Sequence, residues 1–172
     1  MTGTERNERH LIKFLLASAF FFFVGTVHGV LQVQPPIRAW LDSIGSPYGG
    51  PGHMIDPLAH AHVNVVGGVV ILCMAVTYYL LPRISGQALY SHRLVQHTFW
   101  WTAAGITAFY ITLLVFGFIE GQLFLAEDHA AMEAVHRIYT PFIVTAATVM
   151  GIGFWIFFAN VFLTTRRIFA RR

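Results

Sequence analysis

The sequence predicts an all-α membrane protein, a bundle of four transmembrane helices that forms a single domain over residues 1–172. Two observations indicate this fold class. The chain is 56% hydrophobic, with 16 Phe and 4 Trp, and its 11% of charged residues is less than half the share of about 25% that is usual in soluble domains. The apolar residues also gather in four runs, each long enough to cross a bilayer, which takes about 20 residues.

The four runs define the expected helices. They cover residues 11–33, 57–81, 96–119 and 138–164. The hydrocarbon layer offers no partner to backbone N–H and C=O groups, so a segment that spans it must be helical. Because Arg6, Arg9 and Lys13 resemble a basic n-region, the first run is also compatible with a secretory signal. Its length, and the absence of an A-x-A cleavage site after it, favour a retained helix.

Local signals mark the ends of the second helix. Asp56 suits the N-cap position and Pro57 suits the first helical position. Pro82 and Gly86 are expected to end the same helix. Residues 35–52, which connect the first two runs, are rich in Pro and Gly. This composition predicts a structured surface loop and not a strand.

The charged residues predict the orientation in the membrane. One side of the predicted topology carries these basic residues: Arg6, Arg9, Lys13, Arg83, Arg93, Arg166, Arg167, Arg171 and Arg172. Only Arg38 and Arg137 fall on the other side. The positive-inside rule therefore predicts a multi-pass protein of the cytoplasmic (inner) membrane with both termini in the cytoplasm. The net charge of +3 follows from this topology and does not indicate a nucleic-acid partner.

Histidine is unusually frequent in this apolar chain, which has nine. Several are predicted to lie toward the outer face: His28 near the end of the first helix, His60 and His62 in the first turns of the second, and His136 at the start of the fourth. Ionisable side chains at membrane depth are costly and indicate function by default.

His60 and His62 are the most informative pair. Residues two apart on an α-helix point about 200° apart, so the two rings face nearly opposite sides. They are therefore unsuited to chelating one ion together, but each imidazole can be an axial ligand of haem iron. Since Cys73 is the only cysteine, a haem would be bound non-covalently. The alternative is that one or both histidines hydrogen-bond a neighbouring helix.

His28 is flanked by Gly25 and Gly29. Small residues there permit the close approach of a flat ring, or simply of another helix. We interpret Tyr110 as a core or interfacial aromatic residue.

Other residues are candidates for contacts to the haem periphery. His136 is a candidate ligand, a candidate propionate partner or an ordinary helix-start residue. Arg38 and Arg137, the two outer cations, are candidates for neutralising haem propionates, with interfacial snorkelling as the alternative. Glu120 is expected at a solvated helix end, with a place in a proton path as the alternative.

The second helix resembles a known family. Residues 56–68, which contain the His60-Ala-His62 motif, and the Tyr78-to-Arg83 exit resemble the tenth helix of haem-copper oxidase catalytic subunits, above all the C-family oxidases and nitric oxide reductases. Further similarity covers residues 25–40, 89–100 and 134–136. The resemblance implies the last four of that family's twelve helices, one arc of the subunit I fold. In the family, the first His of the motif ligates the high-spin haem and the second ligates the low-spin haem.

The resemblance also has departures that bear on function. The chain is expected to lack the helices that carry the copper ligands and the second low-spin ligand, and it has His28 where C-family oxidases carry an acid. Because the family fold consists of three pseudo-symmetric arcs, a homotrimer of this chain is expected to rebuild it. A haem b would then lie between His62 of one protomer and His60 of the next.

Three functions follow as hypotheses. The leading one is electron transfer through bis-histidine haem b, with quinol or a periplasmic cytochrome c as partner. The second is a haem enzyme that binds or reduces nitric oxide or oxygen at an open iron site. The third is a haem-free accessory subunit of a larger oxidase.

Overall fold

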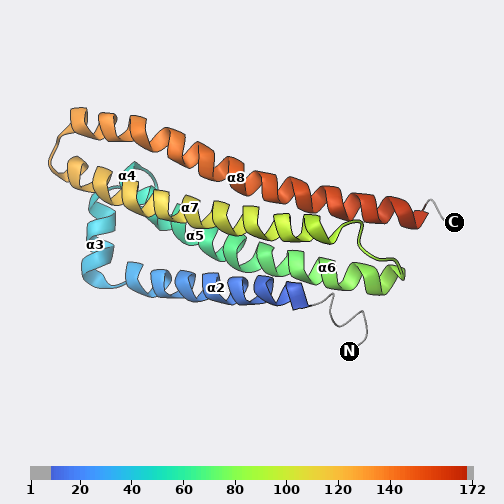
Figure 1. Cartoon of the computed structure of the whole chain (residues 1–172). Helices are drawn as coiled ribbons and strands as arrows, with labels where there is room; N and C mark the ends of the chain where they lie inside the picture. The colour runs from blue at the N-terminus through green and yellow to red at the C-terminus, as the bar shows by residue number, and fades with distance from the viewer. Residues whose placement is uncertain (1–8, 170–172) are drawn as a thin grey trace.

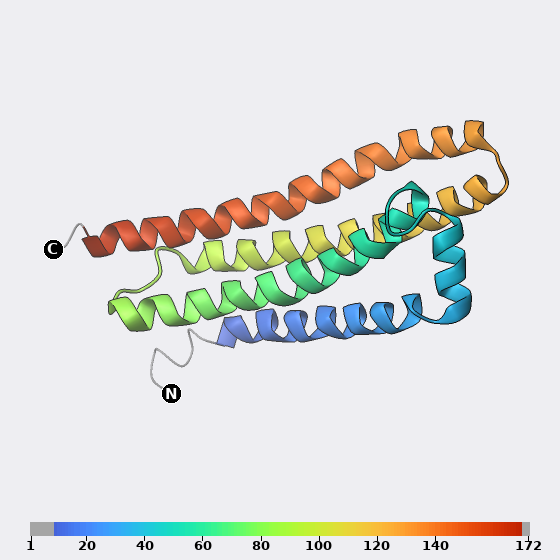
Figure 2. The same ribbon diagram turned by 180° about the vertical axis from the view of Figure 1, so that it is seen from behind.

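The structure is a computed structural model and describes residues 9–169. Four helical segments in it are long and apolar enough to cross a membrane: Arg9–Gln32, Gly50–Ser85, His92–Leu125 and His129–Arg167. They run alongside one another as an elongated bundle (Figures 1 and 2). The predicted all-α fold with four transmembrane helices is therefore confirmed. The second, third and fourth segments extend at both ends beyond their predicted apolar runs.

The first spanning segment leads into a short helix that lies across the end of the bundle. Helix α2 covers Ile12–Gln32 and follows a 3-10 turn, η1, at Arg9–Leu11. Helix α3 covers Pro35–Ser43 and crosses the bundle end, which we call the α3 end (Figure 1). The expectation of a loop over residues 35–52 was therefore wrong in part. A proline in the first helical turn needs no N–H partner, so Pro35 starts a helix instead of preventing one.

The second spanning segment has wide π-type turns and a kink at Asp56. It consists of α4 (Gly50–His53), η2 (Met54–Ala59), α5 (His60–His62), η3 (Val63–Val70) and α6 (Ile71–Ser85). The backbone is non-helical at Asp56, with φ −131° and ψ 113°, and this kink separates two helical stretches. The long helix therefore starts at Pro57, as predicted, and a short helical stretch from Gly50 precedes the kink. Gly86 ends α6 in the left-handed conformation at φ 66°, as predicted, whereas Pro82 lies inside the last turn.

Helices α7 (His92–Leu125) and α8 (His129–Phe169) form a long antiparallel pair. Two glycines permit this approach. A Cβ atom on Gly105 would lie 2.4 Å from the backbone nitrogen of Met150, and one on Gly153 would lie 2.3 Å from Oγ1 of Thr102. Such small-residue contacts are typical of helix pairs in membranes.

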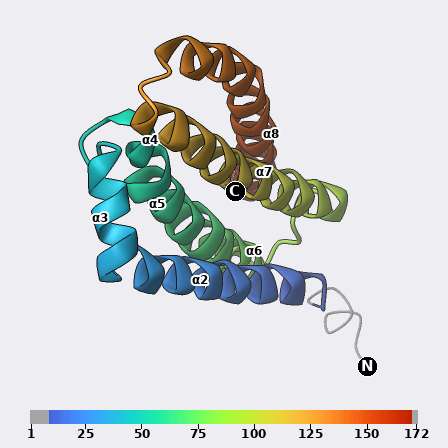
Figure 3. The same cartoon turned by 90° about the vertical axis from the view of Figure 1, so that its left-hand side faces the viewer.

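The main core lies where α2, η3, α6 and α7 meet, around Phe14, Phe21, Tyr78 and Ile106. Helix α8 lies on the far side of α7 from α2 (Figure 3). It leaves large apolar side chains such as Trp155 and Phe158 exposed. This pattern suits a surface that faces lipid or another membrane helix.

Candidate functional site

His60 and His62 lie near the α3 end and face different neighbours. The His60 ring lies edge-on to His28 of α2, with 5.3 Å between ring centroids and 84° between planes. The His62 ring lies beside Phe109 of α7, with 4.7 Å between centroids. Both histidines are only partly buried. The two imidazoles of this helix therefore contact two different neighbouring helices, α2 and α7.

The local backbone anchors one ring nitrogen of His62 and leaves the other available. Its Nδ1 lies 2.8 Å from the carbonyl oxygen of Leu58, one turn earlier. A carbonyl only accepts, so Nδ1 carries the proton and donates it. Nε2 of the neutral ring then holds a lone pair, and no residue in the range 9–169 hydrogen-bonds to it. A ligating imidazole typically has its other ring nitrogen anchored in this way.

His60 packs closely against α2. A Cβ atom on Gly29 would lie 2.8 Å from Cε1 of His60, and one on Gly25 would lie 2.2 Å from Oδ1 of Asn64. The close approach predicted at these glycines is therefore made by side chains of the second helix. Nδ1 of His60 is buried and has no hydrogen-bond partner among the described residues. A buried polar atom without a partner is costly and indicates a role beyond packing.

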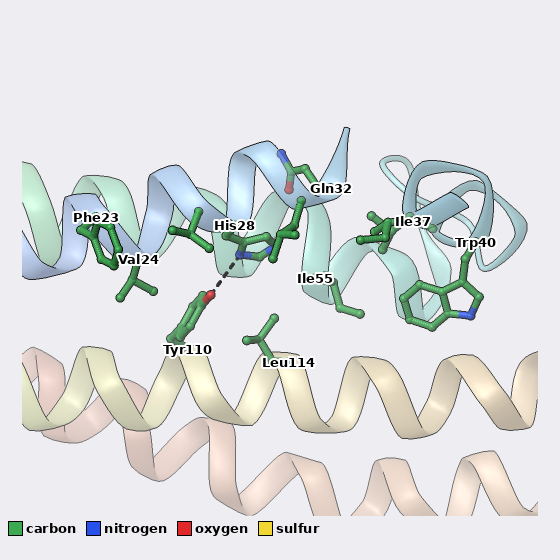
Figure 4. Close-up of a pocket in the computed structure, with 12 residues that line it drawn as sticks. Phe23, Val24, His28, Gln32, Ile37, Trp40, Ile55, Tyr110 and Leu114 are labelled. Carbon is green, nitrogen blue, oxygen red and sulfur yellow. Dashed lines mark hydrogen bonds between the residues drawn. The ribbon is translucent and has the colours of Figure 1, made fainter. Parts of the chain in front are cut away.

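His28 pairs with a residue that the sequence did not single out. It is 8% exposed, and its Nδ1 lies 3.2 Å from the hydroxyl oxygen of Tyr110 in α7. Figure 4 shows this pair at a pocket that extends towards Trp40 of α3. Sequence alone does not identify Tyr110, because nothing local to α7 signals a histidine 82 positions earlier.

His136 pairs with a buried acid. Its Nδ1 lies 3.1 Å and 3.3 Å from the two carboxylate oxygens of Glu120. Glu120 is only 4% exposed, so the expectation of a solvated helix end was wrong. His136 lies about two turns into α8, which begins at His129, so it is not a helix-start residue either. The α7–α8 hairpin buries the carboxylate by folding α8 back over it.

Arg38 is engaged in an ion-pair network. Its guanidinium donates to Asp56 at 2.6 Å, to Asp42 at 2.9 Å and to Ser46 at 2.8 Å. The hydrogen bonds to Asp56 and Asp42 raise the pKa of Arg38 above its ordinary value. Asp56, predicted to be an N-cap, uses its carboxylate here and makes no capping hydrogen bond. Arg137 is exposed and forms no ion pair with a described residue.

The donor set favours one kind of metal cofactor. Among residues 9–169, no group of three or more His, Cys, Asp or Glu residues is arranged to hold a metal ion. A porphyrin supplies four nitrogen ligands of its own and needs only one or two axial imidazoles from protein. His62, with Nδ1 anchored and Nε2 available, fits that requirement. His60, with its unpartnered buried nitrogen, is the second histidine of this kind.

The fold defines a class, a multi-pass helical membrane protein, and in this chain several histidines lie near one end of it. Residues 2–152 match the family model of cytochrome c and quinol oxidase polypeptide I. The match covers most of the chain, and the protein belongs to this family. The resemblance to haem-copper oxidase catalytic subunits is thereby confirmed.

Two curated relatives agree. The chain is 30% identical over 114 residues to cytochrome c oxidase subunit 1 of Rhodobacter capsulatus, a match that covers 57% of this chain and 21% of that protein. It is 22% identical over 159 residues to the cbb3-type cytochrome c oxidase subunit CcoN1 of Stutzerimonas stutzeri, covering 88% of this chain and 30% of that protein. The chain thus spans less than a third of the length of either relative.

Proposed function

We propose that the protein is a membrane haem b protein that transfers electrons, with His60 and His62 as axial ligands. The observation that carries the proposal is the Nδ1 bond from His62 to Leu58, which leaves Nε2 free to bind iron. When bound, haem supplies reversible one-electron chemistry at its iron. The histidines hold the group non-covalently and set its depth near the α3 end.

The second axial ligand is proposed to come from another copy of the chain. His60 and His62 face different helices, and each is only partly buried in the single chain. A closed ring of three copies places His62 of one protomer against His60 of the next. Bis-histidine ligation of this kind leaves the iron no open site, so the residues support electron transfer and not gas binding.

Two polar residues on α8 are proposed to bind haem propionates. His136 is about half exposed, and the neighbouring Arg137 is exposed and free of ion pairs within the described chain. Charge-assisted hydrogen bonds to carboxylates are the strong kind. Arg38 is the weaker candidate, because its guanidinium is already neutralised by Asp42 and Asp56.

We further propose that the α3 end faces the periplasm, with both termini at the cytoplasmic face of the inner membrane. The described basic residues Arg9, Arg83, Arg93, Arg166 and Arg167 lie at the opposite end, which supports this orientation. Electrons then enter or leave near the outer face, from quinol or from a periplasmic cytochrome c.

An optical and pyridine-haemochrome spectrum of the purified protein tests the haem assignment. We expect low-spin haem b in the unaltered protein and loss of haem in His60→Ala and in His62→Ala. His97→Ala is the matched control. This exposed histidine lies near the start of α7, at the opposite end of the bundle from α3. Full haem retention in both variants would overturn the assignment.

Native mass spectrometry tests the ring. The proposal expects three chains with three haems. A monomer that keeps its haem contradicts ligation shared between two copies. The haem would then be held by histidines of one chain.

One observation favours a second function. The hydrogen-bonded pair of His28 and Tyr110 lies next to His60, with 5.3 Å between the imidazole centroids. A tyrosine and a histidine beside an iron ligand can deliver protons to a bound diatomic gas. If His60 serves an iron with an open site, the protein is a haem enzyme that acts on nitric oxide or oxygen. A shift of the reduced spectrum on adding carbon monoxide distinguishes this function from the first.

A further inference from the structure

A cavity of about 290 Å³ lies at the end of the bundle opposite α3, which we call the arginine-rich end (Figure 1). It is bounded by η1, the last turns of α6, the α6–α7 loop and the start of α7. Its polar wall consists of His10, Arg83, Gln87 and His92, and none of the described residues that line it is acidic. The wall therefore favours an anionic ligand that accepts hydrogen bonds.

A second cavity, of about 220 Å³, continues the first toward the middle of the bundle. Leu11 and Tyr79 line both cavities. The second is otherwise lined by side chains without a hydrogen-bonding group: Leu15, Ala75 and Val76. Val76 precedes Arg83 by two helical turns, so the apolar cavity extends about 10 Å along α6 from the basic wall. One elongated ligand with a polar head and an apolar tail can therefore occupy both.

Arg83 is held at the junction of the two cavities. Its Cζ lies 3.5 Å from the centroid of the Tyr79 ring, and its guanidinium donates to the carbonyl oxygen of Tyr79 at 3.3 Å. A guanidinium has five N–H donors in a planar fork that fits phosphate oxygens, so it can bind a phosphate and keep these contacts. In the same cavity the rings of His10 and His92 meet edge to face, with 5.4 Å between centroids, and imidazole N–H groups are further donors.

These features separate three ligands that carry a phosphate. Inorganic phosphate satisfies the basic wall but leaves the apolar cavity unfilled. A zwitterionic lipid fills the apolar cavity but brings a cation to a wall of donors. We propose that the two cavities bind one anionic phospholipid, with its phosphate at Arg83 and the two histidines and an acyl chain along Leu15 and Val76. Basic pockets between membrane helices bind such headgroups in other membrane proteins. The site requires no haem.

Native mass spectrometry of the full-length protein in detergent, titrated with dioleoyl phosphatidylglycerol, tests the site. We expect saturable binding of one lipid per chain, and binding about tenfold weaker for dioleoyl phosphatidylcholine. Inorganic phosphate in large excess should not displace the lipid. Arg83→Gln removes the charge of an exposed side chain. We expect it to raise the half-saturating lipid concentration about tenfold, which corresponds to about 1.4 kcal/mol. His92→Ala, at a second exposed position of the wall, should weaken binding in the same direction.

Val76→Phe tests the apolar cavity, because the larger side chain fills it from an exposed position. We expect this variant to weaken binding of the dioleoyl lipid about fourfold, the effect of losing about one buried CH₂ group. Binding of dihexanoyl phosphatidylglycerol should be unchanged, since its short chains do not reach Val76. Unaltered affinity for the dioleoyl lipid would refute the acyl-chain placement.

Arg93→Gln is the matched control, because Arg93 is an exposed arginine of the same end that lines neither cavity. It should bind the lipid like the unaltered protein. An equal loss in Arg83→Gln and Arg93→Gln would show only a diffuse attraction of anionic lipid to the basic end. Equal binding of the two dioleoyl lipids, or displacement by inorganic phosphate, would likewise overturn the phospholipid site.

Discussion

At the arginine-rich end of the bundle, Asn160 is fully buried and both halves of its carboxamide are paired. Its Oδ1 accepts from the N–H of Ser91 and its Nδ2 donates to the carbonyl of Ser91, each at 3.1 Å. At the α3 end, Nδ1 of His60 and Oε1 of Gln32 are buried without hydrogen-bond partners among the described residues. The carboxamide of Asn160 thus has its hydrogen bonds complete, whereas these two polar atoms at the α3 end lack theirs among the described residues.

The difference separates polar groups that stabilise the fold from polar groups that are available to bind a ligand. In lipid a buried polar side chain is tolerated when its hydrogen bonds are complete, and Asn160 then joins α8 to the α6–α7 loop. An incomplete set reduces stability, so it is retained where a ligand completes it. We expect variants of Asn160 and Tyr78 to change stability, and variants at the α3 end to change ligand binding as well.

The largest effect on stability is expected for Asn160→Leu. The substitution leaves the N–H of Ser91 without a partner, which costs about 1–3 kcal/mol. It also removes one of the two hydrogen bonds that the C=O of Ser91 accepts, at about 1 kcal/mol, so we expect a loss of about 3 kcal/mol. Unfolding by heat or SDS, followed by circular dichroism, measures it. The haem content of the folded fraction should be unchanged, and a selective loss of haem would break the division between the two ends.

A smaller loss, about 2 kcal/mol, is expected for Arg38→Gln, because it removes charged hydrogen bonds to Asp56 and Asp42. The pKa of Arg38 is raised on folding, so its contribution is complete below the unfolded-state pKa and is lost only at strongly alkaline pH. The destabilisation should therefore be constant across the neutral range. Arg137→Gln is the control and should be near neutral, since Arg137 is exposed.

Gly29→Ala tests the position of the His60 ring at the α3 end. The new methyl group would lie 2.8 Å from Cε1 of His60 and must displace that ring, which costs about 1.5 kcal/mol. We also expect reduced haem affinity, measured by haem titration. Gly151→Ala is the matched control, because a Cβ there meets no atom within 4 Å and alanine favours the helix. Equal haem affinity in both variants would contradict the placement of His60.

The smallest effect is expected for Tyr78→Phe. The hydroxyl of Tyr78 lies 2.8 Å from Oγ1 of the fully buried Thr98, a neutral pair whose loss costs about 1 kcal/mol. Thermal unfolding measures the change. No change in ligand binding at the α3 end should accompany it, and any such change would show that the two ends are coupled.

The fold was largely predictable because its determinants are local. Apolar runs of sufficient length must form helices in lipid, and Gly86 ends α6, as expected. Helix α3 was missed because the Pro35-Pro36 pair indicates a turn as readily as a helix start. The candidate site was predictable only in part. The spacing of His60 and His62 is encoded within one helix, whereas the partner of each side chain is not.

The sequence by itself determined the class of protein, the number of membrane crossings and the two imidazoles on different faces of the second helix. Hydrocarbon leaves a long apolar chain no alternative to the helix, and helical geometry then places neighbouring side chains. Only the tertiary structure decided that Tyr110 pairs with His28, that Glu120 is buried against His136, and that Gly29 admits His60. These contacts join residues from different helices, and their distances depend on how whole helices pack.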